Sequence, residues 1–418
     1  MSIETTVANH LVSPERSVGL PPGAILPDYG GYAVDGVPAL IEHILGVRET
    51  APRLAEALDP GAGAFDHVLF LLLDGLGYDR LLRREAADPG LLFAELAKRG
   101  RRLPITSVFP STTTTSLTTY STGLPPIAHG MLGYRLYLRE AASVTNMIRF
   151  STVANPRGDS ALTAGLDLDR LVPGLTLYER LAEARVATQV LLPQHICSSG
   201  LSRLLYRGAD TIHPCATLAD MCVTARQLLQ SAENRNLVTL YHPGLDTIGH
   251  GRGPNTDAYN AELGLISEAL RRELDGQVGR TLLIISSDHG FVPLQPADYL
   301  ELPKSGEVWR SLAHPPVGEP RASYLHARAN GSAALKQAVE SFGNGRLWVS
   351  AASDATDVGL FGTGTPHAEF EYRIGDVLAV STKQQSLYHD FPDAVRLAGM
   401  HGGLTREEML VPLIVCPM

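Results

Sequence analysis

The residues best suited to chemistry in this sequence are three aspartates and three histidines, each beside a glycine or near the end of an apolar run. They are Asp74, Asp246, His250, Asp288, His289 and His401. Zinc and similar divalent metals bind such mixtures of oxygen and nitrogen ligands, and six ligands suffice for two ions that keep open positions. Three carboxylates, two divalent ions and one bound alkoxide also sum to zero charge. Together the six residues predict a two-metal site, although any one of them alone is more typical of a turn or a solvated helix face.

A hydroxyl-rich stretch offers the nucleophile that such a site needs. Residues 108–123 read Val-Phe-Pro-Ser-Thr-Thr-Thr-Thr-Ser-Leu-Thr-Thr-Tyr-Ser-Thr-Gly. Because threonine side chains are stiff at χ1, this stretch is a poor linker, and Gly123 with the prolines after it indicates the end of a short helix. Two interpretations stay open on these residues alone: the threonines cap a helix, or one hydroxyl is activated as a nucleophile.

The elements that must hold these residues alternate between strands and helices. Six apolar residues from Val68 to Leu73 indicate a strand buried on both faces, with Asp74 at its carboxyl end. Further strands are predicted at 186–192, 237–241, 280–286 and 409–416, and helices at 78–99 with a break at 89–90, at 216–231 and at 257–274. This alternation predicts an α/β fold with a mostly parallel sheet and helices on both faces, whose strand ends meet at one edge.

The pattern divides the chain into three parts. Residues 1–60 are rich in proline and glycine around one helix, Val37 to Leu45, and indicate an irregular lead-in packed on the core. Residues 61–291 and 386–418 carry the α/β pattern and form the predicted core. Residues 292–385 carry short β-like pieces with glycine and proline, which predicts a smaller inserted β-rich lobe.

Bulk properties exclude several classes of protein. The chain has 418 residues, 44% of them hydrophobic and 19% charged, which is typical of a globular protein with a sizeable core. A net charge of −9 argues against a nucleic-acid polymer or an anionic membrane as the main partner. We expect a cytoplasmic protein, because the sequence has no leader pattern and no apolar run long enough to span a membrane. Its cysteines lack C-x-x-C spacing, which favours free thiols.

The order of these motifs resembles that of the alkaline phosphatase superfamily, and within it the type I phosphodiesterase and nucleotide pyrophosphatase branch. The matching motifs are Leu73-Asp-Gly75, Phe109-Pro-Ser-Thr-Thr113, Ser121-Thr-Gly-Leu-Pro-Pro-Ile-Ala-His-Gly130, Asp246-Thr-Ile-Gly-His250, Asp288-His-Gly290 and His401-Gly402. The resemblance extends over about residues 65 to 415 and leaves the first 60 residues and the insert outside it. It implies an alkaline phosphatase-like three-layer α/β/α sandwich.

The same resemblance implies a role for each ligand. One metal would be held by Asp246, His250 and His401, and a second by Asp74, Asp288 and His289. The family's nucleophile lies three residues after the proline of its Phe-Pro motif, which falls on Thr113, with Thr112 as the fallback. Attack by Thr113 on phosphorus would give a covalent phosphothreonine, which water then releases.

One position departs from the branch. Five residues after the His-Gly histidine, where these proteins usually carry an asparagine that donates to a phosphate oxygen, this chain has Tyr134. Either Tyr134 or Arg135 is a candidate to replace that donor, since arginine binds phosphate in a bidentate manner, and both are equally compatible with ordinary packing. Asn146 and Arg149 are further polar candidates.

These observations predict a hydrolase that cleaves phosphodiester or nucleotide pyrophosphate bonds. The expected substrate is a small phosphate ester, with nucleotides among the candidates. Zinc is the expected metal at both positions, with manganese or iron as substitutes because half of the ligands are oxygens. The alternatives are a phosphonate hydrolase of the phosphonoacetate type or a phosphomonoesterase with the same machinery, and a metal- or phosphate-binding relative without turnover. The sequence leaves the oligomeric state and the role of the insert open.

Overall fold

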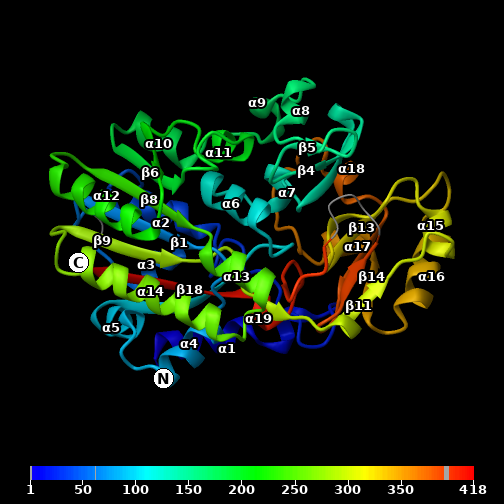
Figure 1. The fold of residues 1–418 in the computed structure, drawn as a ribbon, viewed down its shortest axis with the longest axis horizontal. Helices are drawn as coiled ribbons and strands as arrows, with labels where there is room; N and C mark the ends of the chain where they lie inside the picture. Colours follow the sequence, from blue (N-terminus) through cyan, green and yellow to red (C-terminus); the bar gives the residue numbers. More distant parts are fainter. Residues whose placement is uncertain (1, 62, 390–394) are drawn as a thin grey trace.

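A computed structural model describes residues 2–61, 63–389 and 395–418 of the chain. In this part of the chain, the larger unit is built on a seven-stranded sheet with the order β2-β18-β9-β1-β8-β6-β7 (Figure 1). Its strands are β2 (Arg101–Thr106), β18 (Leu410–Pro417), β9 (Thr281–Ser286), β1 (His67–Leu73), β8 (Asn236–His242), β6 (Ala187–Pro193) and β7 (Thr211–Cys215). Strands β9, β1, β8, β6 and β7 pair in parallel, and β18 runs antiparallel to β9 and β2. The predicted mostly parallel sheet is therefore confirmed.

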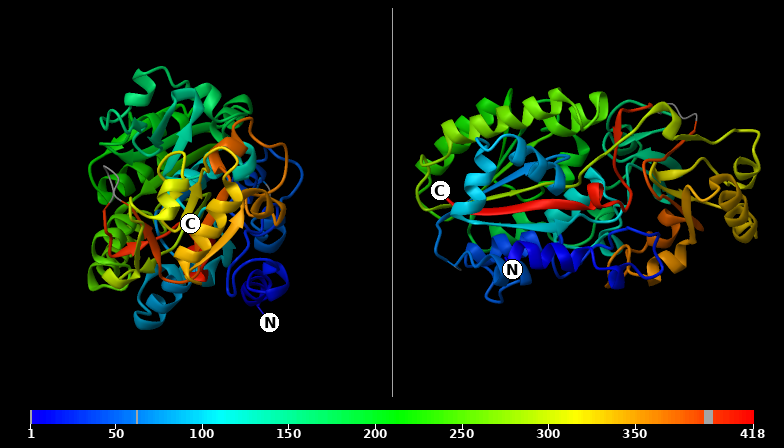
Figure 2. Two further views of the ribbon diagram at one scale, coloured as in Figure 1. Left: turned by 90° about the vertical axis from the view of Figure 1, so that its right-hand side faces the viewer. Right: turned by 90° about the horizontal axis from the view of Figure 1, so that it is seen from below.

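Helices cover both faces of this sheet, which gives three layers (Figure 2). Strand β1 shows why: Val68, Phe70 and Leu72 join one hydrophobic core, whereas the alternate residues Leu69, Leu71 and Leu73 join the other. The first core also takes residues from helices α2 (Gly36–Ile44) and α10 (Leu177–Glu183), and the second takes residues from α5 (Leu92–Arg99), α12 (Leu218–Ser231) and α14 (Asp257–Glu273). Because both faces of β1 are buried, its sequence is an unbroken apolar run rather than an alternating one.

The register of the central strands brings their carboxyl ends to one edge. Leu73 of β1 lies opposite His242 of β8, and Leu72 lies opposite Ser286 of β9. The next residues after these strands therefore share one edge of the sheet. Helix α13 (Gly244–Arg252) begins directly after β8 at this edge.

The second seven-stranded sheet, built of shorter strands, lies at the other end of the molecule, and its strand pairs are antiparallel (Figure 1). Its order is β14 (Leu347–Ala351), β15 (Val377–Ser381), β13 (Ala322–Leu325), β12 (Val317–Glu319), β3 (Arg135–Leu138), β4 (Ser143–Asn146) and β5 (Ser151–Thr152). The sequence pattern assigns residues 135–152 to the core, but they extend this second sheet instead. Strand β3 joins β12 in this sheet through a single residue pairing, that of Arg135 with Gly318. No local sequence pattern encodes this pairing.

The first 60 residues contain more helix than the pattern predicts. Helix α2 matches the expected Val37 to Leu45 segment, and α3 (Arg53–Leu58) and α1 (Ile3–Leu11) are additional. Val7 and Leu11 of α1 are buried against the core, so this helix depends on tertiary packing more than on its own hydrophobic pattern. Among the described residues, no helix is both long and apolar enough to cross a membrane.

A buried ion pair joins the second sheet to the edge of the first sheet at which its central parallel strands end. The Arg321 guanidinium donates to both carboxylate oxygens of Glu408, at 2.5 and 2.9 Å, and neither side chain is exposed. Glu408 lies in helix α19 (Arg406–Met409), and its carboxylate also accepts from the backbone N–H of Gly403 at 2.8 Å. The pair therefore fixes the loop that carries His401.

We predict that Arg321→Met destabilises the protein by about 3–5 kcal/mol, because it leaves the Glu408 carboxylate buried without its cation. A lower unfolding midpoint in differential scanning calorimetry would record the loss. The double variant Arg321→Met with Glu408→Leu should recover a large part of it, since both buried charges are then gone. A double variant as unstable as the single one would contradict this account.

Candidate two-metal active site

The six predicted ligands converge at the carboxyl edge of the central sheet. Asp74 follows β1, Asp288 and His289 follow β9, and the remaining ligands come from α13 and from the loop before β18. The Nε2 atom of His289 lies 3.5 Å from Asp74 Oδ1 and 3.3 Å from Asp288 Oδ2. The three groups form one face of the cluster and are almost completely buried.

Asp246 lies between the two halves of the cluster. Its Oδ1 atom is 3.3 Å from His250 Nε2, 3.8 Å from His401 Nε2 and 4.0 Å from His289 Nε2. Asp246 and His250 face the same way because they are four residues apart on helix α13. The Nε2 atoms of His250 and His401 are 3.2 Å apart, close enough to share one bound ion.

Backbone carbonyls fix the orientation of all three imidazoles. The Nδ1 atoms of His250, His289 and His401 lie 2.9, 3.1 and 2.9 Å from the carbonyl oxygens of Gly399, Gly290 and Ser111. A carbonyl oxygen only accepts, so each Nδ1 carries the proton and each Nε2 is left with a free lone pair. All three lone pairs therefore point toward the aspartates in the form that binds metal.

The aspartates are held on one side and left unsatisfied on the other. Asp288 Oδ1 accepts from the backbone N–H groups of Gly75 and His289, both at 3.0 Å, and Asp74 Oδ2 accepts from the Tyr241 hydroxyl. The opposite oxygens, Asp74 Oδ1, Asp246 Oδ1 and Asp288 Oδ2, are buried without a hydrogen-bond partner. Unpaired carboxylate oxygens are costly in a buried site unless a cation compensates them.

The pKa values of the clustered aspartates and histidines reflect the cost of burying unpaired carboxylates. Burial first, and then the charges of Asp288 and Asp246, hold the pKa of Asp74 well above its usual range. Burial also raises the pKa of Asp246. Burial and the neighbouring imidazoles hold the pKa of His401 well below its usual range, which keeps this histidine neutral. The unpaired oxygens and neutral imidazoles together suit divalent cations.

Two groups of three ligand atoms, each within 4.8 Å of one another, satisfy the geometry of metal binding. The first is Asp246, His250 and His401, as the family resemblance implies. The second is Asp74, Asp246 and His289, where the resemblance implies Asp288 in place of Asp246. Asp288 Oδ2 still lies 3.3 Å from His289 Nε2, so it remains next to the second group. Asp246 is the one residue common to both.

Thr113 begins the helix that faces the cluster. Helix α6 (Thr113–Thr122) has Thr112 as its N-cap residue in an extended conformation, so the predicted start of the helix is confirmed. The Thr113 hydroxyl lies 3.2 Å from His289 Nε2. Of the neighbouring threonines, Thr114 and Thr115 have buried hydroxyls without a partner among the described residues, and they pack rather than cap. The free N–H groups and positive end of α6 therefore point at the region beside Thr113, where they favour an anion.

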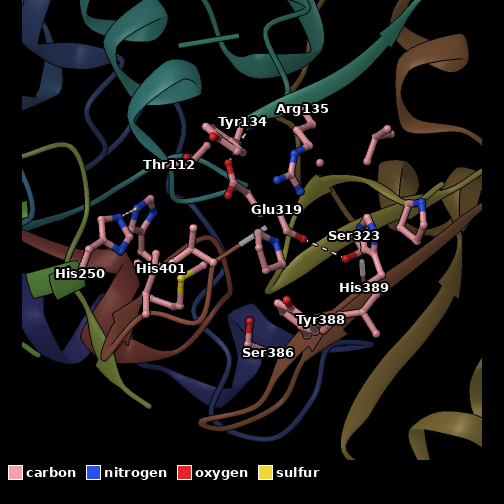
Figure 3. Close-up of a pocket in the computed structure, with 18 of the residues that line it drawn as sticks. Thr112, Tyr134, Arg135, His250, Glu319, Ser323, Ser386, Tyr388, His389 and His401 are labelled. Carbon is pink, nitrogen blue, oxygen red and sulfur yellow. Dashed lines mark hydrogen bonds between the residues drawn. The ribbon is translucent and has the colours of Figure 1, made fainter. Parts of the chain in front are cut away.

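The cluster opens into a cavity of about 300 Å³ between the two sheets (Figure 3). Its lining includes Thr112, Thr113, His250 and His401 together with Tyr134 and Arg135, and Figure 3 shows Arg135 on the side away from His250. The Tyr134 hydroxyl accepts from Asn146 Nδ2 at 2.7 Å, so Asn146 supports the wall without lining the cavity. Arg149 does not line the cavity either. Of the four polar candidates, Tyr134 and Arg135 therefore line the cavity, and Asn146 and Arg149 do not.

Sequence reasoning missed Glu319, a carboxylate in the same cavity. It is 4% exposed, and burial raises its pKa to about 7. Hydrogen bonds from the Thr112 side chain and the Tyr134 backbone, and the charge of Arg135, oppose that rise. Glu319 lies in the predicted lobe, far in sequence from every motif, and only the pairing of β12 with β3 brings it here. No sequence signal pointed to it.

The two sheets and this site define an alkaline phosphatase-like α/β protein. The chain belongs to the type I phosphodiesterase / nucleotide pyrophosphatase family, whose model matches residues 68–404. A comparison with curated proteins finds no match.

Several solved structures share the fold. One is a murine ectonucleotide pyrophosphatase / phosphodiesterase 5, in an inactive form in complex with AMP, with a TM-score of 0.61, 16% identity and coverage of 83% of this chain and 87% of that one. The human protein of the same name has a TM-score of 0.61, 17% identity and coverage of 84% and 87%. Phosphonoacetate hydrolase from Sinorhizobium meliloti, in complex with phosphonoformate, has a TM-score of 0.58, 19% identity and coverage of 83% and 89%. At these identities the likeness shows the fold alone.

We predict that the purified protein takes up two zinc ions per chain and that Asp246→Ala loses both, because Asp246 belongs to both ligand groups. His250→Ala should lose about one ion. Each ion supplied at 100 times its dissociation constant stabilises the fold by about 2.7 kcal/mol. Elemental analysis after dialysis, with calorimetry beside it, measures these effects.

The matched control is His242→Ala, which removes an imidazole that contacts Glu262 at 2.8 Å near the same strand end but outside both ligand groups. This variant should keep two ions. An Asp246→Ala protein that still held two ions would contradict the shared position of Asp246.

Proposed function

We propose that this protein is a two-metal hydrolase of phosphodiester or nucleotide pyrophosphate bonds, with Thr113 as the nucleophile. The single observation that carries the proposal is the position of the Thr113 hydroxyl, which lies 3.2 Å from His289 Nε2, an atom of the candidate ligand cluster. Membership of the type I phosphodiesterase / nucleotide pyrophosphatase family supports the same reaction class.

The residues of the chain supply the nucleophile and its orientation. Thr113 Oγ1 loses its proton and attacks phosphorus in line with the leaving group; the bond to the leaving oxygen breaks, that oxygen takes up a proton from solvent, and a phosphothreonine forms. Water then attacks the same phosphorus, the bond to Thr113 Oγ1 breaks, and a proton released by the attacking water restores the Thr113 hydroxyl. The N-terminal N–H groups of α6 stabilise the negative charge on the phosphoryl oxygens during both steps.

The metals supply what these side chains lack. Two divalent ions held by the six ligands, zinc first among the candidates, would lower the pKa of the attacking hydroxyl and offset the phosphoryl charge. Of these ligands, His289 contacts the Thr113 hydroxyl, and it belongs to the group that would hold the second ion; His250 and His401 belong to the other group.

The cavity favours an ester with a sizeable apolar or aromatic group. Beyond the polar end, its walls include Tyr299, Val317, Leu387, Tyr388 and Leu397. Tyrosine rings stack on nucleobases and aryl groups alike. Because the similar murine protein was crystallised with AMP, we include nucleotides among the proposed substrates. Arg135 is the proposed contact for a second anionic group of the substrate.

A phosphonate hydrolase is the second candidate function. The structural likeness to a phosphonoacetate hydrolase favours it, since that protein has the same fold with a TM-score of 0.58. Its substrate is small and doubly anionic, and the apolar walls of the present cavity suit such a molecule less well. We therefore rank the diester reaction first.

We predict that Thr113→Ala lowers kcat on bis(p-nitrophenyl) phosphate by about 1,000-fold or more at unchanged metal content, because the covalent route is lost. Thr113→Ser should retain measurable turnover, and acid-quenched wild-type enzyme should yield a phosphorylated peptide that contains residue 113. Thr112→Ala, which removes the fallback nucleophile, should cost far less. Full activity in Thr113→Ala would refute the assignment.

The substrate class has its own test. We expect kcat/KM for bis(p-nitrophenyl) phosphate to exceed that for p-nitrophenyl phosphate and for phosphonoacetate by about tenfold or more, which corresponds to about 1.4 kcal/mol of transition-state binding. Release of p-nitrophenol and of inorganic phosphate measures all three rates. A faster reaction with phosphonoacetate would select the second candidate function instead.

A further inference from the structure

Glu319 is an acidic side chain that lines the active-site cavity without belonging to either metal group. Among the described lining residues, the other acidic side chain is Asp246, which both groups contain. Figure 3 places Glu319 between Thr112 and Arg135, on the side of the cavity away from His250. A buried carboxylate so close to a site for anions calls for an explanation, because it opposes their binding.

Two contacts locate the carboxylate relative to the reaction. Its side chain hydrogen-bonds to Thr112, the residue directly before the nucleophile. On the other side it packs against Gly402, where an added Cβ would lie 2.9 Å from Glu319 Cβ. Gly402 follows the ligand His401. Glu319 therefore contacts the residue before the proposed nucleophile and the residue after a proposed metal ligand.

The carboxylate is held in this place and does not swing away. Its Oε1 atom accepts from the Tyr134 backbone N–H at 2.7 Å, and the Ser323 hydroxyl donates to its carbonyl oxygen at 2.9 Å. It ends strand β12, which pairs with β13 on one side and with β3 on the other. A fixed charge acts on the substrate more strongly than a mobile, solvated one.

Charge balance then separates the substrate classes. Three ligand carboxylates and Glu319 contribute −4 when ionised, two divalent ions would contribute +4, and Arg135, whose charge acts on Glu319, contributes +1, so these groups sum to +1 before any substrate binds. A phosphodiester adds one negative charge, whereas a phosphomonoester adds about two near neutral pH. Each added negative charge is repelled by Glu319, and at the short range of a partly buried site one unit charge changes an equilibrium by about tenfold or more.

We propose that Glu319 is a specificity-determining residue that selects monoanionic phosphodiesters over dianionic phosphomonoesters. This inference rests on the proposed function, because it assigns a preference within that reaction. In this proposal the metal ligands with their ions and the N-terminus of α6 attract monoesters and diesters alike. Glu319 repels the second negative charge of a monoester.

A purely structural role makes a different prediction. If Glu319 only ties the Tyr134 backbone to Thr112, its loss would slow diester and monoester reactions alike, because both use the same nucleophile and metals. A charge filter instead changes their ratio. The ratio of the two rates is therefore the quantity to measure.

The kinetic test compares wild type, Glu319→Gln and Glu319→Asp at a pH of about 8.5, above the pKa of Glu319. The kcat/KM ratio of p-nitrophenyl phosphate to bis(p-nitrophenyl) phosphate should rise about tenfold or more in Glu319→Gln. It should stay near the wild-type value in Glu319→Asp, which keeps the charge. The control Glu301→Gln makes the same change at an exposed carboxylate that pairs with Arg396, and it should leave the ratio unchanged.

A binding test does not depend on turnover. In a Thr113→Ala background with both metals loaded, calorimetry should find that Glu319→Gln increases the affinity for inorganic phosphate, a dianion at this pH, by about tenfold. The affinity for bis(p-nitrophenyl) phosphate should change much less. Equal changes for both ligands, or no change for either, would overturn the role of Glu319. If wild type turns over neither ester, the proposed function fails instead, and phosphate binding still tests the charge filter.

Discussion

The structure depends on three aspartates, two of them buried and Asp246 partly buried, that each have one buried oxygen without a hydrogen-bond partner among the described residues. Asp74, Asp246 and Asp288 each present one such atom to the same small volume, where their mutual repulsion and loss of hydration oppose folding. Divalent cations would offset this repulsion, and the neighbouring imidazoles present unprotonated nitrogens to the same volume. The cluster is therefore a candidate site for positive charge.

The rest of the fold supplies the rigidity that such a site requires. Parallel strands with one common register bring the aspartates to one edge, and backbone carbonyls hold the histidine rings in one tautomer. The second sheet contributes no metal ligand, but it forms the opposite wall of the cavity through Tyr134, Arg135 and Glu319. The first sheet thus carries the candidate metal ligands at its edge, and the second sheet lines the cavity beside them.

Much of the first sheet could be predicted because its signals are local. The run from Val68 to Leu73 indicates a doubly buried strand by composition alone, and Gly123 with its prolines marks the end of α6. The second sheet could not be predicted in the same way. Strands β3 and β12 meet through the pairing of Arg135 with Gly318, which are far apart in the sequence. This pairing uses backbone hydrogen bonds that almost any residue type can form.

By itself the sequence determined the kinds of ligand, their order along the chain and the hydroxyl-rich helix start, because side-chain chemistry and strand periodicity are properties of single segments. Only the tertiary structure decided that Asp246 belongs to both candidate ligand groups and that Glu319 hydrogen-bonds to Thr112. Those facts depend on distances between segments. Such distances follow from how two sheets pack, and no short stretch of residues contains them.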